Sequence, residues 1–473
     1  MQAAEQFEYV FLGGGKGGKS LATELAKAGK RVAVVERGMI GGSCINVACI
    51  PTKALIRSAR VAHAVSEAAA YGIETGPLHV NMKKIRDRVQ GVVDGLVEVN
   101  LNSFKAAGFD LMLGNGRFVA PRTLEVQLND GGVRVIEGER VYINTGTHAA
   151  VPSIPGMREA EPLTHVEALQ IEDVPSHLIV IGGGYIGLEM AQAVRRLGAR
   201  VTVLQRESRV AVREDADVSQ AIADALKSDG IDIRTNVTPV SVSGKSGSAV
   251  TITLEGGDVV EGSHILAATG RVPNTQGIGL DIAGVEVDAR GIIKVDERLQ
   301  TTAPNVFAIG EVAGTPMFTH ASFDDYRVLS SQLKGGTKTT RDRVIPYAMF
   351  IEPELSRVGI NETEAAAKGI AVRTATLSMK AVPRARTNSD TRGFMKVLVA
   401  ADSDQILGFT MLGSEAGEIV STVQIAMLGK LPYTVIRDAA LAHPTLAEGL
   451  NLLFALIPAR DVQASEKETA LAK

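Results

Sequence analysis

Alternation between apolar runs and helical segments divides the chain into recurring strand-helix-strand units. Residues 8–12 (EYVFL) are a short apolar run that leads into GGGKGGKS, then into LATELAKAG with helical spacing, then into RVAVVE at 31–36. Short apolar runs on either side of a helical segment predict a β-α-β unit. The pattern recurs at 177–206, where HLIVI, GGGYIGLEMAQAVRRLGA and RVTVLQR follow one another. The chain therefore carries two copies of a unit typical of dinucleotide-binding domains.

The segments outside these units predict the rest of the architecture. Residues 80–107 have the period of a long amphipathic helix, and strand-like alternation follows in RFVA, TLEVQL and VRVIEGERVYINTG. Short apolar segments at 265–271 and 305–314 resemble returns into a sheet, and beyond Pro346 long strands alternate with helices. We predict an α/β protein with two Rossmann-like dinucleotide-binding domains and a C-terminal α+β domain.

Length and turn residues give the expected domain boundaries. The chain has 473 residues, too many for one hydrophobic core. Ser153-Ile154-Pro155-Gly156 predicts a domain crossing, and the small polar residues at 464–473 predict a frayed end. The predicted segments are the first part of a dinucleotide-binding domain, a second dinucleotide-binding domain, the remainder of the first domain and a C-terminal domain, at 1–152, 153–270, 271–345 and 346–473.

Charge and hydropathy exclude several classes of partner. The formal net charge is -3 and neither sign forms a long run, which argues against a nucleic-acid partner. The N-terminal MQAAEQFEYV lacks a basic region typical of a signal peptide, and the apolar runs are too short to span a membrane. We expect no membrane partner and a location in the cytoplasm of a prokaryote-like cell.

The first glycine-rich turn predicts a dinucleotide site. Its pattern is Gly13-x-Gly15-x-x-Gly18, and Glu36 ends the next strand at the distance expected of a ribose-binding acid. Glycines let the backbone approach a pyrophosphate at the helix N-terminus, where Lys16 and Lys19 would add positive charge. An ordinary tight turn is the alternative, but the strand, helix and acid in register favour the nucleotide.

The second glycine-rich turn predicts a different nucleotide. Its pattern is Gly182-x-Gly184-x-x-Gly187, but the following strand ends in Leu204-Gln205-Arg206 without an acid, and Arg209 follows. An arginine at this position suits the 2'-phosphate of NADPH rather than a free ribose hydroxyl. The alternative is that both arginines are solvated surface residues, in which case NADH is possible.

The only two cysteines, Cys44 and Cys49, lie together in GGSCINVACIPTK. Two cysteines are too few for a structural zinc site, and a reducing compartment disfavours a structural disulfide, so we predict no metal site. Cys49 precedes an apparent helix, whose N-terminal partial charge would stabilise a thiolate. The pair therefore predicts a dithiol that accepts and passes on two electrons; buried inert cysteines are the alternative.

A histidine near the C-terminus is a candidate acid-base group. His443 precedes a proline at an apparent helix start, and Glu448 follows five residues later. This arrangement fits a base oriented by a carboxylate, although a lone histidine is more often structural.

The cysteine segment, together with YIGLE, ATGRVPN, NVFAIGEV and HPTLAE in the same order, resembles the class I pyridine nucleotide-disulfide oxidoreductases. That family includes dihydrolipoamide dehydrogenase, glutathione reductase and mercuric reductase. The resemblance covers essentially the whole chain. It implies FAD in the first domain, NAD(P)H in the second, and dimerisation through 346–473.

The resemblance also implies roles for individual residues. Cys49 would be the charge-transfer thiol against the flavin, and Cys44 the interchange thiol that faces the substrate. Lys53 and Glu189 would pair near the flavin N5, and Tyr185 would be the gate over the nicotinamide pocket.

In this family the acid-base histidine reaches over from the other subunit. His443, oriented by Glu448, would therefore act on Cys44 of the second copy, which implies an obligate homodimer. The remaining positions that the resemblance assigns to cofactor binding are Arg37, Gly42, Ser43, Thr145, Gly146, Gly270, Gly310 and Glu311.

The sequence departs from the family in three ways. Glu311 stands where the family has an aspartate that holds the ribityl chain of the flavin. The chain lacks the C-terminal cysteine pair with which mercuric reductases deliver Hg(II). Dihydrolipoamide dehydrogenases usually have a glutamate where Gln205 or Arg206 stands.

Other stretches, among them GGGKGGKSLA, FTHASFDDYR and ELSRVG, resemble a mercuric-reductase-like branch of bacterial flavoproteins of reactive-chlorine resistance. We predict an FAD-containing oxidoreductase that passes electrons from NADPH to a small disulfide, a metal ion such as Cu(II) or Hg(II), or a reactive oxidant. The alternatives are a dihydrolipoamide dehydrogenase and a redox sensor without turnover. Asp324 and Asp325 would lie near the flavin's pyrimidine end, or else be solvated acids at a helix start.

Overall fold

The structure, a computed structural model, describes residues 3–341 and 343–460. The chain divides into two compact units. One comprises the residues up to 152 with 163–174 and 267–343, and the other comprises 153–162, 175–266 and the residues from 344 onward. The finer division into four segments stays a prediction, and the predicted frayed end at 464–473 lies outside the described residues. Within the described ranges, no helix is long and apolar enough to cross a membrane.

The first unit is built on a six-stranded sheet that combines parallel and antiparallel pairs. Strand β1 (Glu5–Leu12) pairs in parallel with two neighbours, and β4 (Thr123–Leu128) pairs with both of its neighbours in the antiparallel direction. The strands are β1 (Glu5–Leu12), β2 (Val32–Glu36), β3 (Asp110–Ala120), β4 (Thr123–Leu128), β5 (Val133–Ile143) and β15 (Val306–Ala308). A separate pair consists of β6 (Thr147–Ala149) and β14 (Arg271–Pro273).

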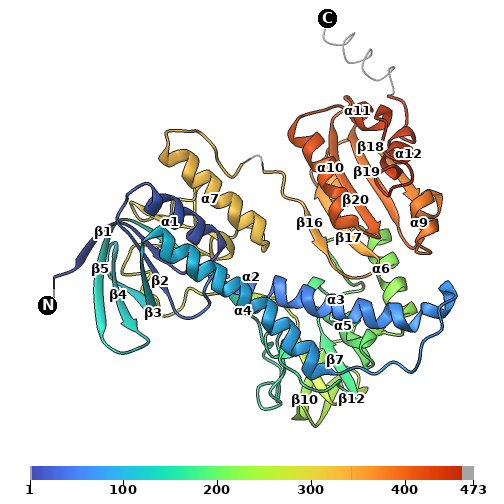
Figure 1. The fold of residues 1–473 in the computed structure, drawn as a ribbon, viewed down its shortest axis with the longest axis horizontal. Helices are drawn as coiled ribbons and strands as arrows, with labels where there is room; N and C mark the ends of the chain where they lie inside the picture. The colour runs from blue at the N-terminus through green and yellow to red at the C-terminus, as the bar shows by residue number, and fades with distance from the viewer. Residues whose placement is uncertain (1–2, 342, 461–473) are drawn as a thin grey trace, which may run out of the picture. The chain divides into compact units, whose positions relative to one another are not determined.

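Helices cover one face of this sheet. The α-helices are α1 (Lys16–Lys27), α2 (Ser43–Asn46), α3 (Cys49–Ser66), α4 (Met82–Ala107) and α7 (Thr319–Leu333), with short 3-10 turns η1 (Ala68–Tyr71), η2 (Glu167–Leu169) and η3 (Gly310–Ala313). Figure 1 shows α1 between α4 and α7. Phe11, Leu21, Phe104 and Val328 form a shared core there. Helix α4 confirms the helix predicted at 80–107.

The second unit begins with the other nucleotide-binding fold. A four-stranded sheet in the order β13-β7-β8-β9 carries two helices, and a three-stranded antiparallel sheet follows. The elements are β7 (His177–Ile181), α5 (Tyr185–Arg196), β8 (Arg200–Leu204), α6 (Ala216–Ser228), β9 (Asp232–Arg234), β10 (Pro239–Lys245), β11 (Ala249–Leu254), β12 (Val259–Gly262) and β13 (His264–Ala267). The second β-α-β unit is therefore formed as predicted.

The rest of the second unit is the predicted α+β domain. Five antiparallel strands in the order β16-β17-β20-β19-β18 pack against helices, with α10 over β17 and β20 and α12 over β18 and β19. The elements are β16 (Tyr347–Met349), β17 (Glu354–Gly359), α8 (Glu362–Ala367), β18 (Val372–Ser378), η4 (Met379–Ala381), α9 (Pro383–Thr387), β19 (Phe394–Ala400), β20 (Ile406–Gly413), α10 (Ala416–Leu428), α11 (Tyr433–Asp438) and α12 (Gly449–Ala455).

Candidate active site

The turn after β1 packs tightly against the end of β5. Gly13 has φ +105°, and a Cβ there would lie 2.4 Å from the carbonyl oxygen of Asn144. Cβ atoms on Gly15 and Gly18 would lie 2.8 and 2.7 Å from Asn144 Oδ1. Only glycine fits at these three positions, which leaves the N-terminus of α1 open to a phosphate group.

Glu36 lies against this turn, as the sequence predicted. Its side chain is buried, Oε2 accepts a hydrogen bond from the Gly14 N-H at 2.8 Å, and Oε1 accepts from Gly38 and Met39 at 2.9 Å. The carbonyl of the neighbouring Arg37 accepts from Asn129 Nδ2 at 3.0 Å. The contacts of Glu36 and Arg37 with a cofactor stay predictions.

Asn144 is a residue that sequence reasoning missed. Its Oδ1 accepts from the Gly18 N-H at 3.0 Å, and its Nδ2 donates to the Ile309 carbonyl at 2.9 Å, so it ties the fingerprint turn to the end of β15. The available signal was a polar residue directly after the apolar strand in RVYINTG.

Thr145, which follows Asn144, has a side-chain hydroxyl that is available to a cofactor. Thr145 Oγ1 is buried and has no hydrogen-bond partner within the described part of the chain. Its backbone nitrogen lies 3.1 Å from the position of a Cβ on Gly13, and Gly146 has φ +65°. A buried unsatisfied hydroxyl is rare, so the residues here fit a bound FAD, which the fingerprint turn, Glu36 and Thr145 would hold.

Glu311 contacts residues of the β6–β14 pair. Its Oε2 accepts from the Thr147 hydroxyl and from Arg271 Nε, the latter at 3.1 Å. The extra methylene relative to aspartate therefore lets the carboxylate reach the β6–β14 pair. Gly310 (φ +77°) and Gly270 (φ +141°) flank these groups in the left-handed region. A contact of Glu311 with the flavin stays a prediction.

The two aspartates of α7 are buried, so the alternative of solvated acids is wrong. Asp325 accepts from the Gly310 N-H at 2.7 Å, from Thr315 Oγ1 at 2.8 Å and from Arg343 at 2.5 Å. Burial raises its pKa, against the opposing effect of the Arg343 charge. Asp324 accepts from Lys338 Nζ at 2.6 Å. Asp325 therefore supports the turn at Gly310.

The cysteine segment packs directly on the fingerprint turn. Gly42 has φ +89°, and a Cβ there would lie 2.9 Å from Gly15 Cα. Ser43 begins α2, and Cys49 is the first residue of α3, which confirms the predicted helix start. Cys49 Sγ lies 3.4 Å from Thr319 Oγ1 at the start of α7. Both cysteines are partly exposed thiols, with no disulfide between them.

Its surroundings make the Cys44 thiol harder to ionise. The pKa of the Cys44 thiol is raised by its hydrogen bond with Cys49, and next by burial and by the charge of Cys49. Thr319 and Lys19 lower it. Because the pair shares a hydrogen bond, the second proton leaves with more difficulty than the first. Cys49 lies at the N-terminus of α3, and its role as the charge-transfer thiol stays a prediction.

Lys19 does not lie where the sequence suggested. It was expected to add charge for a pyrophosphate, but it is buried and its Nζ donates to Asn100 Oδ1 at 2.5 Å. A Cβ on Gly41 would lie 3.2 Å from this Nζ, which places the ammonium beside the cysteine segment. Burial lowers the pKa of Lys19 to about 8. Lys16 instead lies over the Phe323 ring, 4.6 Å from its centroid.

Lys53 and Glu189 belong to different units. Lys53 follows Cys49 by four residues on α3, so the two lie on one face of the helix. Glu189 is buried on α5, and its Oε1 accepts from the Phe350 N-H at 2.8 Å. Their pairing stays a prediction.

The second glycine turn repeats the geometry of the first with one chemical change. Gly182 has φ +110°, Gly184 precedes the first residue of α5, and Gly187 is buried in that helix. The Gly183 N-H donates to Gln205 Oε1 at 2.7 Å, and the two residues are 22 apart, as are Gly14 and Glu36. A neutral amide therefore occupies the position of the ribose-binding acid.

Of the two arginines after β8, Arg206 is exposed and Arg209 is half-buried, and Arg206 is paired with an acid that the prediction overlooked. The Arg206 side chain is 76% exposed, and its NH2 group lies 2.8 Å from Glu207 Oε1. Arg209 donates to the Val212 carbonyl at 3.5 Å. Glu207 thus competes with a nucleotide phosphate for Arg206, and a preference for NADPH stays a prediction.

His443 and Glu448 are brought together as predicted. Nδ1 of His443 lies 3.0 Å from both carboxylate oxygens of Glu448, and the histidine side chain is 67% exposed. With the carboxylate ionised, Nδ1 carries the proton and Nε2 is able to accept one. The catalytic role of the pair stays a prediction.

Similarity to known proteins decides the family. The family model described as pyridine nucleotide-disulphide oxidoreductase matches residues 7–325, and the model of its dimerisation domain matches residues 345–453. The chain belongs to this family. It is an FAD-dependent oxidoreductase that uses a pyridine nucleotide, so the sensor without turnover is not retained.

Relatives within the family refine this assignment. The probable pyridine nucleotide-disulfide oxidoreductase RclA of Escherichia coli (strain K12) is 36% identical over 458 residues, covering 96% of this chain and 99% of that protein. A mercuric reductase of Shigella flexneri is 34% identical over 452 residues, covering 93% of this chain and 79% of the reductase.

A solved structure agrees with these relatives. The Cu(II) complex of HOCl-induced flavoprotein disulfide reductase RclA from Escherichia coli has a TM-score of 0.88 at 35% identity, covering 96% of this chain and 100% of that chain. The resemblance stated from the motifs is thereby confirmed, and the dihydrolipoamide dehydrogenase alternative is not favoured.

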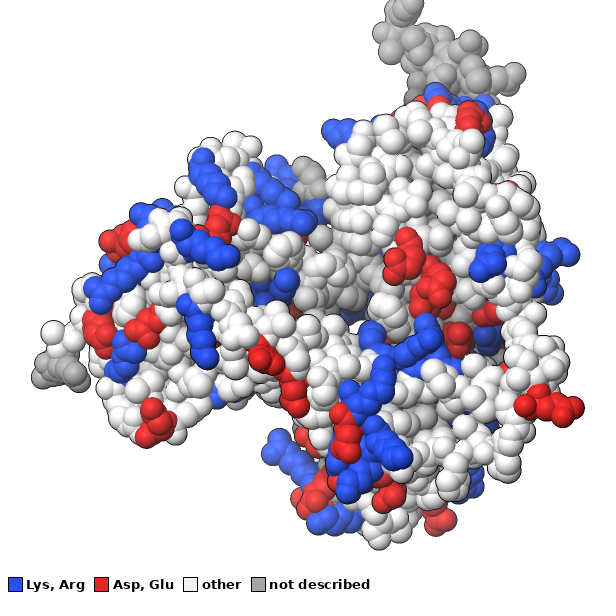
Figure 2. All heavy atoms as spheres, in the orientation of Figure 1, with Lys and Arg blue, Asp and Glu red and all other residues white. Residues whose placement is uncertain are grey.

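The family's dimerisation domain presents apolar side chains to solvent. Ile425, Leu428 and Leu456 are 64%, 54% and 52% exposed, and they lie on α10 and at the end of α12. Figure 2 shows few charged side chains around α10. Their exposure is compatible with a subunit interface on this domain.

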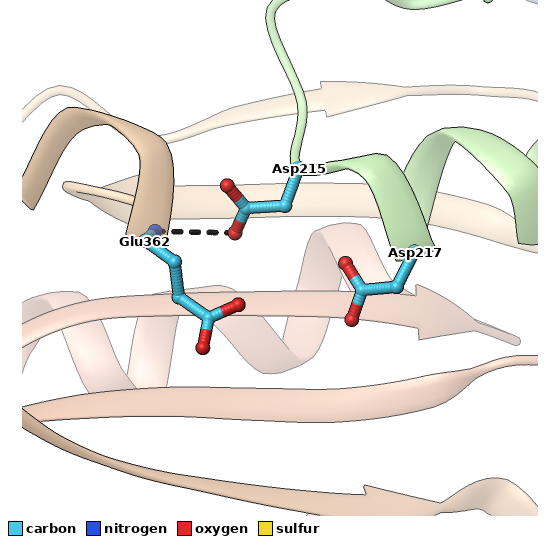
Figure 3. Close-up of side chains that lie close together, drawn as sticks. All are labelled: Asp215, Asp217 and Glu362. Atoms are coloured by element: carbon cyan, nitrogen blue, oxygen red, sulfur yellow. Dashed lines mark hydrogen bonds between the residues drawn. The ribbon is translucent and has the colours of Figure 1, made fainter. Parts of the chain in front are cut away.

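Three carboxylates meet at the junction of α6 and α8, where Asp215, Asp217 and Glu362 have oxygens within 4.8 Å of one another (Figure 3). A lysine compensates their charge. The Nζ of Lys396 lies 2.6 Å from Asp217, 2.7 Å from Glu362 and 3.6 Å from Asp215. We read this cluster as an ion-pair network that joins the nucleotide-binding fold to the dimerisation domain.

Proposed function

We propose that the protein is a homodimeric, NADPH-preferring flavoprotein that reduces a thiol-reactive acceptor through Cys44 and Cys49. The acceptor is a small disulfide, a metal ion such as Cu(II) or Hg(II), or a reactive oxidant. The observation that carries the proposal is the packing of the cysteine segment on the FAD fingerprint turn, with Gly42 against Gly15. FAD, when bound, links two-electron oxidation of NADPH to reduction of the cysteine pair.

With a disulfide acceptor, the electron balance is simple. The Cys44 thiolate attacks one sulfur of the substrate, forms a mixed disulfide and releases the first thiolate, which takes a proton from His443. The Cys49 thiolate then attacks the Cys44 sulfur, releases the second thiolate and closes the Cys44–Cys49 disulfide. One NADPH and one proton thus convert one disulfide into two thiols.

With a metal acceptor, the same dithiol supplies two electrons. It reduces two Cu(II) to two Cu(I), or one Hg(II) to Hg(0), and becomes a disulfide with loss of two protons. Copper is the acceptor we favour, because the similar RclA structure is described as a Cu(II) complex. The chain has no further cysteine to relay a metal ion, so the ion must reach Cys44 directly.

The second copy of the chain completes the site. We infer that the exposed apolar side chains of α10 and α12 are covered in a homodimer, because the chain carries the family's dimerisation domain. His443 of one copy then exchanges protons with Cys44 of the other. We propose a cytoplasmic location, because a compartment that disfavours structural disulfides leaves the cysteine pair available for redox catalysis.

The test is steady-state NADPH oxidation with Cu(II), Hg(II), lipoamide, glutathione disulfide and a quinone as acceptors. We expect turnover with at least one thiol-reactive acceptor, and Cu(II) as the best of them. The Cys44→Ser variant should lose that turnover while NADPH still reduces its flavin, and Cys49→Ser should lose it as well. Undiminished turnover in Cys44→Ser would contradict electron transfer through the Cys44–Cys49 dithiol.

A further inference from the structure

Tyr185, the first residue of α5 after the second glycine turn, is bound to a buried carboxylate. Its hydroxyl donates to Oε1 of Glu214, a residue that is 1% exposed. The same oxygen accepts a second hydrogen bond from the Tyr347 hydroxyl at 2.6 Å. The two rings lie 5.6 Å apart between centroids, at 33° to each other. Two phenols thus share one carboxylate oxygen.

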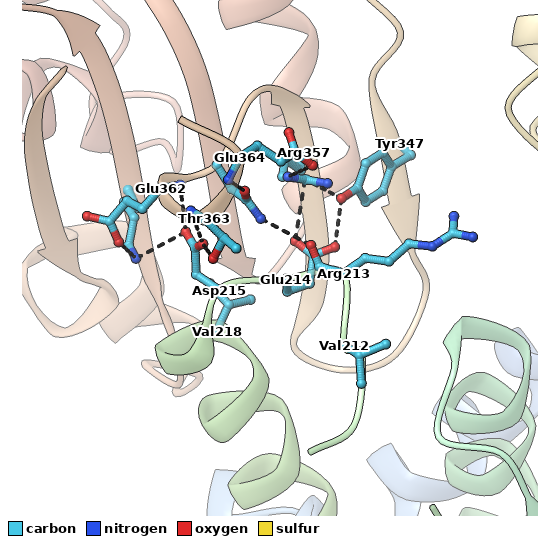
Figure 4. Close-up of polar contacts among 12 residues, drawn as sticks. Val212, Arg213, Glu214, Asp215, Val218, Tyr347, Arg357, Glu362, Thr363 and Glu364 are labelled. Atoms are coloured by element: carbon cyan, nitrogen blue, oxygen red, sulfur yellow. Dashed lines mark hydrogen bonds and ion pairs between the residues drawn. The ribbon is translucent and has the colours of Figure 1, made fainter. Parts of the chain in front are cut away.

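An arginine completes the cluster from the dimerisation domain. Nε of Arg357 on β17 donates to the Tyr347 hydroxyl and lies 3.5 Å from Glu214 Oε2 (Figure 4). The guanidinium carbon lies 5.2 Å from the centre of the Tyr347 ring, and NH1 lies 3.0 Å from Glu364. Glu214 lies just before α6 in the nucleotide-binding fold, whereas Tyr347 and Arg357 belong to β16 and β17.

The partners of Glu214 are not equivalent. Tyr347 and Arg357 bond to each other as well as to Glu214, so they stay in place if the Tyr185 side chain leaves. The Glu214 carboxylate would then keep a phenol and a cation, and it would not be left as an unpaired buried charge. Burial and the Glu214 charge raise the pKa of Tyr185, so this phenol remains a donor throughout the physiological range.

We propose that Glu214, held by Tyr347 and Arg357, is a positioning residue that retains Tyr185 in its nucleotide-free position. The family resemblance implies that Tyr185 is the gate over the nicotinamide pocket; we include this gate in the proposed function, and the inference rests on it. In that role Tyr185 moves when the nicotinamide binds, so binding must break the hydrogen bond to Glu214. The cluster therefore sets the affinity for the nicotinamide nucleotide from outside its binding pocket, through residues of the dimerisation domain.

The decisive variant is Glu214→Gln, which keeps the shape of the side chain but removes its charge. A neutral acceptor holds a phenol less tightly than a carboxylate does, so the position that excludes the nucleotide becomes less populated. We expect NADP+ to bind the FAD-loaded Glu214→Gln homodimer about five- to tenfold more tightly than it binds the unmodified protein. Isothermal titration calorimetry measures this affinity without turnover.

Tyr185→Phe and the double variant test whether Glu214 acts through Tyr185. Tyr185→Phe should also tighten NADP+ binding, and adding Glu214→Gln to it should give no further change. Glu364→Gln, which alters the other carboxylate partner of Arg357, is the matched control and should leave the affinity unchanged. Thermal unfolding checks that each variant is folded; if Glu214→Gln is not, Glu214→Asp, with its shorter reach, replaces it and should shift the affinity in the same direction.

The outcomes separate the two claims. If Tyr185→Phe tightens binding but Glu214→Gln does not, or if Glu214→Gln has the same effect in both backgrounds, the positioning role of Glu214 is wrong while the gate stands. If Tyr185→Phe leaves NADP+ binding unchanged, the gate role in the proposed function is wrong, and the inference falls with it.

Discussion

Gly42 approaches Gly15 so closely that a Cβ on Gly42 would lie 2.9 Å from the Gly15 Cα. The dithiol segment and the FAD fingerprint turn are therefore one packed structure. Any side chain at position 42 must push these two loops apart.

Gly42→Ala should accordingly weaken the binding of the flavin. The left-handed φ of +89° costs about 1 kcal/mol for alanine, and the clash adds about 1–3 kcal/mol. Gly29→Ala is the matched control, because Gly29 has φ +79° but nothing within 4 Å of its Cβ position. Flavin release on dilution, followed by fluorescence, should rise only in Gly42→Ala; equal release from both variants would mean that the contact is unimportant.

Glu448→Ala should slow oxidation of the reduced enzyme by its acceptor and leave reduction of the flavin by NADPH unchanged. The carboxylate fixes Nδ1 of His443 at 3.0 Å, and an unoriented base loses about a hundredfold in proton-transfer efficiency. Stopped-flow oxidation of the reduced enzyme by its disulfide acceptor should slow by about that factor, while flavin reduction by NADPH is unchanged. Glu448→Gln, which retains an acceptor for the Nδ1 proton, should recover most of the rate. An unaffected Glu448→Ala would exclude Glu448 as the group that orients His443.

Lys19→Met should stabilise the protein near neutral pH. Burial holds the pKa of Lys19 at about 8, below the value of 10.5 for a free lysine, so the folded state disfavours the charge. Below pH 8 this costs about 3 kcal/mol, and the cost fades as pH rises from 8 to 10.5, where only the unfolded state still binds the proton.

Denaturant unfolding between pH 7 and 10.5 measures this effect. The stability advantage of Lys19→Met should shrink steadily across that range. Lys27→Met, at the exposed end of the same helix, should show no such trend. A constant difference between Lys19→Met and the unmodified protein would contradict a buried, titrating lysine.

The same Lys19→Met substitution should make Cys44 harder to ionise. The Lys19 charge favours ionisation of the Cys44 thiol, so its removal should slow iodoacetamide alkylation of Cys44 in the reduced enzyme below pH 8, where Lys19 is charged. Peptide mass spectrometry distinguishes alkylation of Cys44 from that of Cys49. An unchanged rate would show that the lysine is too well screened to act on the thiol.

Glu207→Gln should increase the preference for NADPH over NADH. Glu207 pairs with Arg206 at 2.8 Å, and neutralising it frees the guanidinium for a 2'-phosphate. We expect the ratio of kcat/KM values to rise about fivefold, equivalent to about 1 kcal/mol. Glu255→Gln, an exposed glutamate in the same unit, is the control. A ratio that does not move would show that Arg206 does not contact the phosphate.

The cofactor turns were the most predictable part of the molecule. Gly13 packs against the backbone of Asn144, and Gly15 and Gly18 pack against its side chain, so none of the three has room for a Cβ, and all three were identifiable from spacing alone. The pairing of His443 with Glu448 was also predictable, because both lie within one local segment.

The partners of these residues were not predictable, because they come from distant parts of the chain. Asn144 reaches Gly18 across 126 residues, and Tyr347 reaches Glu214 across 133. A local pattern can mark a polar residue after a strand, as in RVYINTG, but not the residue that it contacts. The position of Lys19 was mistaken for the same reason, since its partner Asn100 lies on α4.

The sequence by itself determined the two nucleotide-binding units, the position of the cysteine pair at a helix start and the family, because periodicity, glycine spacing and helix starts are local properties of the chain. Only the tertiary structure decided which charges are buried and what compensates them: Lys19 beside the thiols, Glu311 on Arg271, and Glu214 beneath two tyrosines. The free energy of a buried charge depends on every group packed around it, and that set is fixed only when the whole chain has folded.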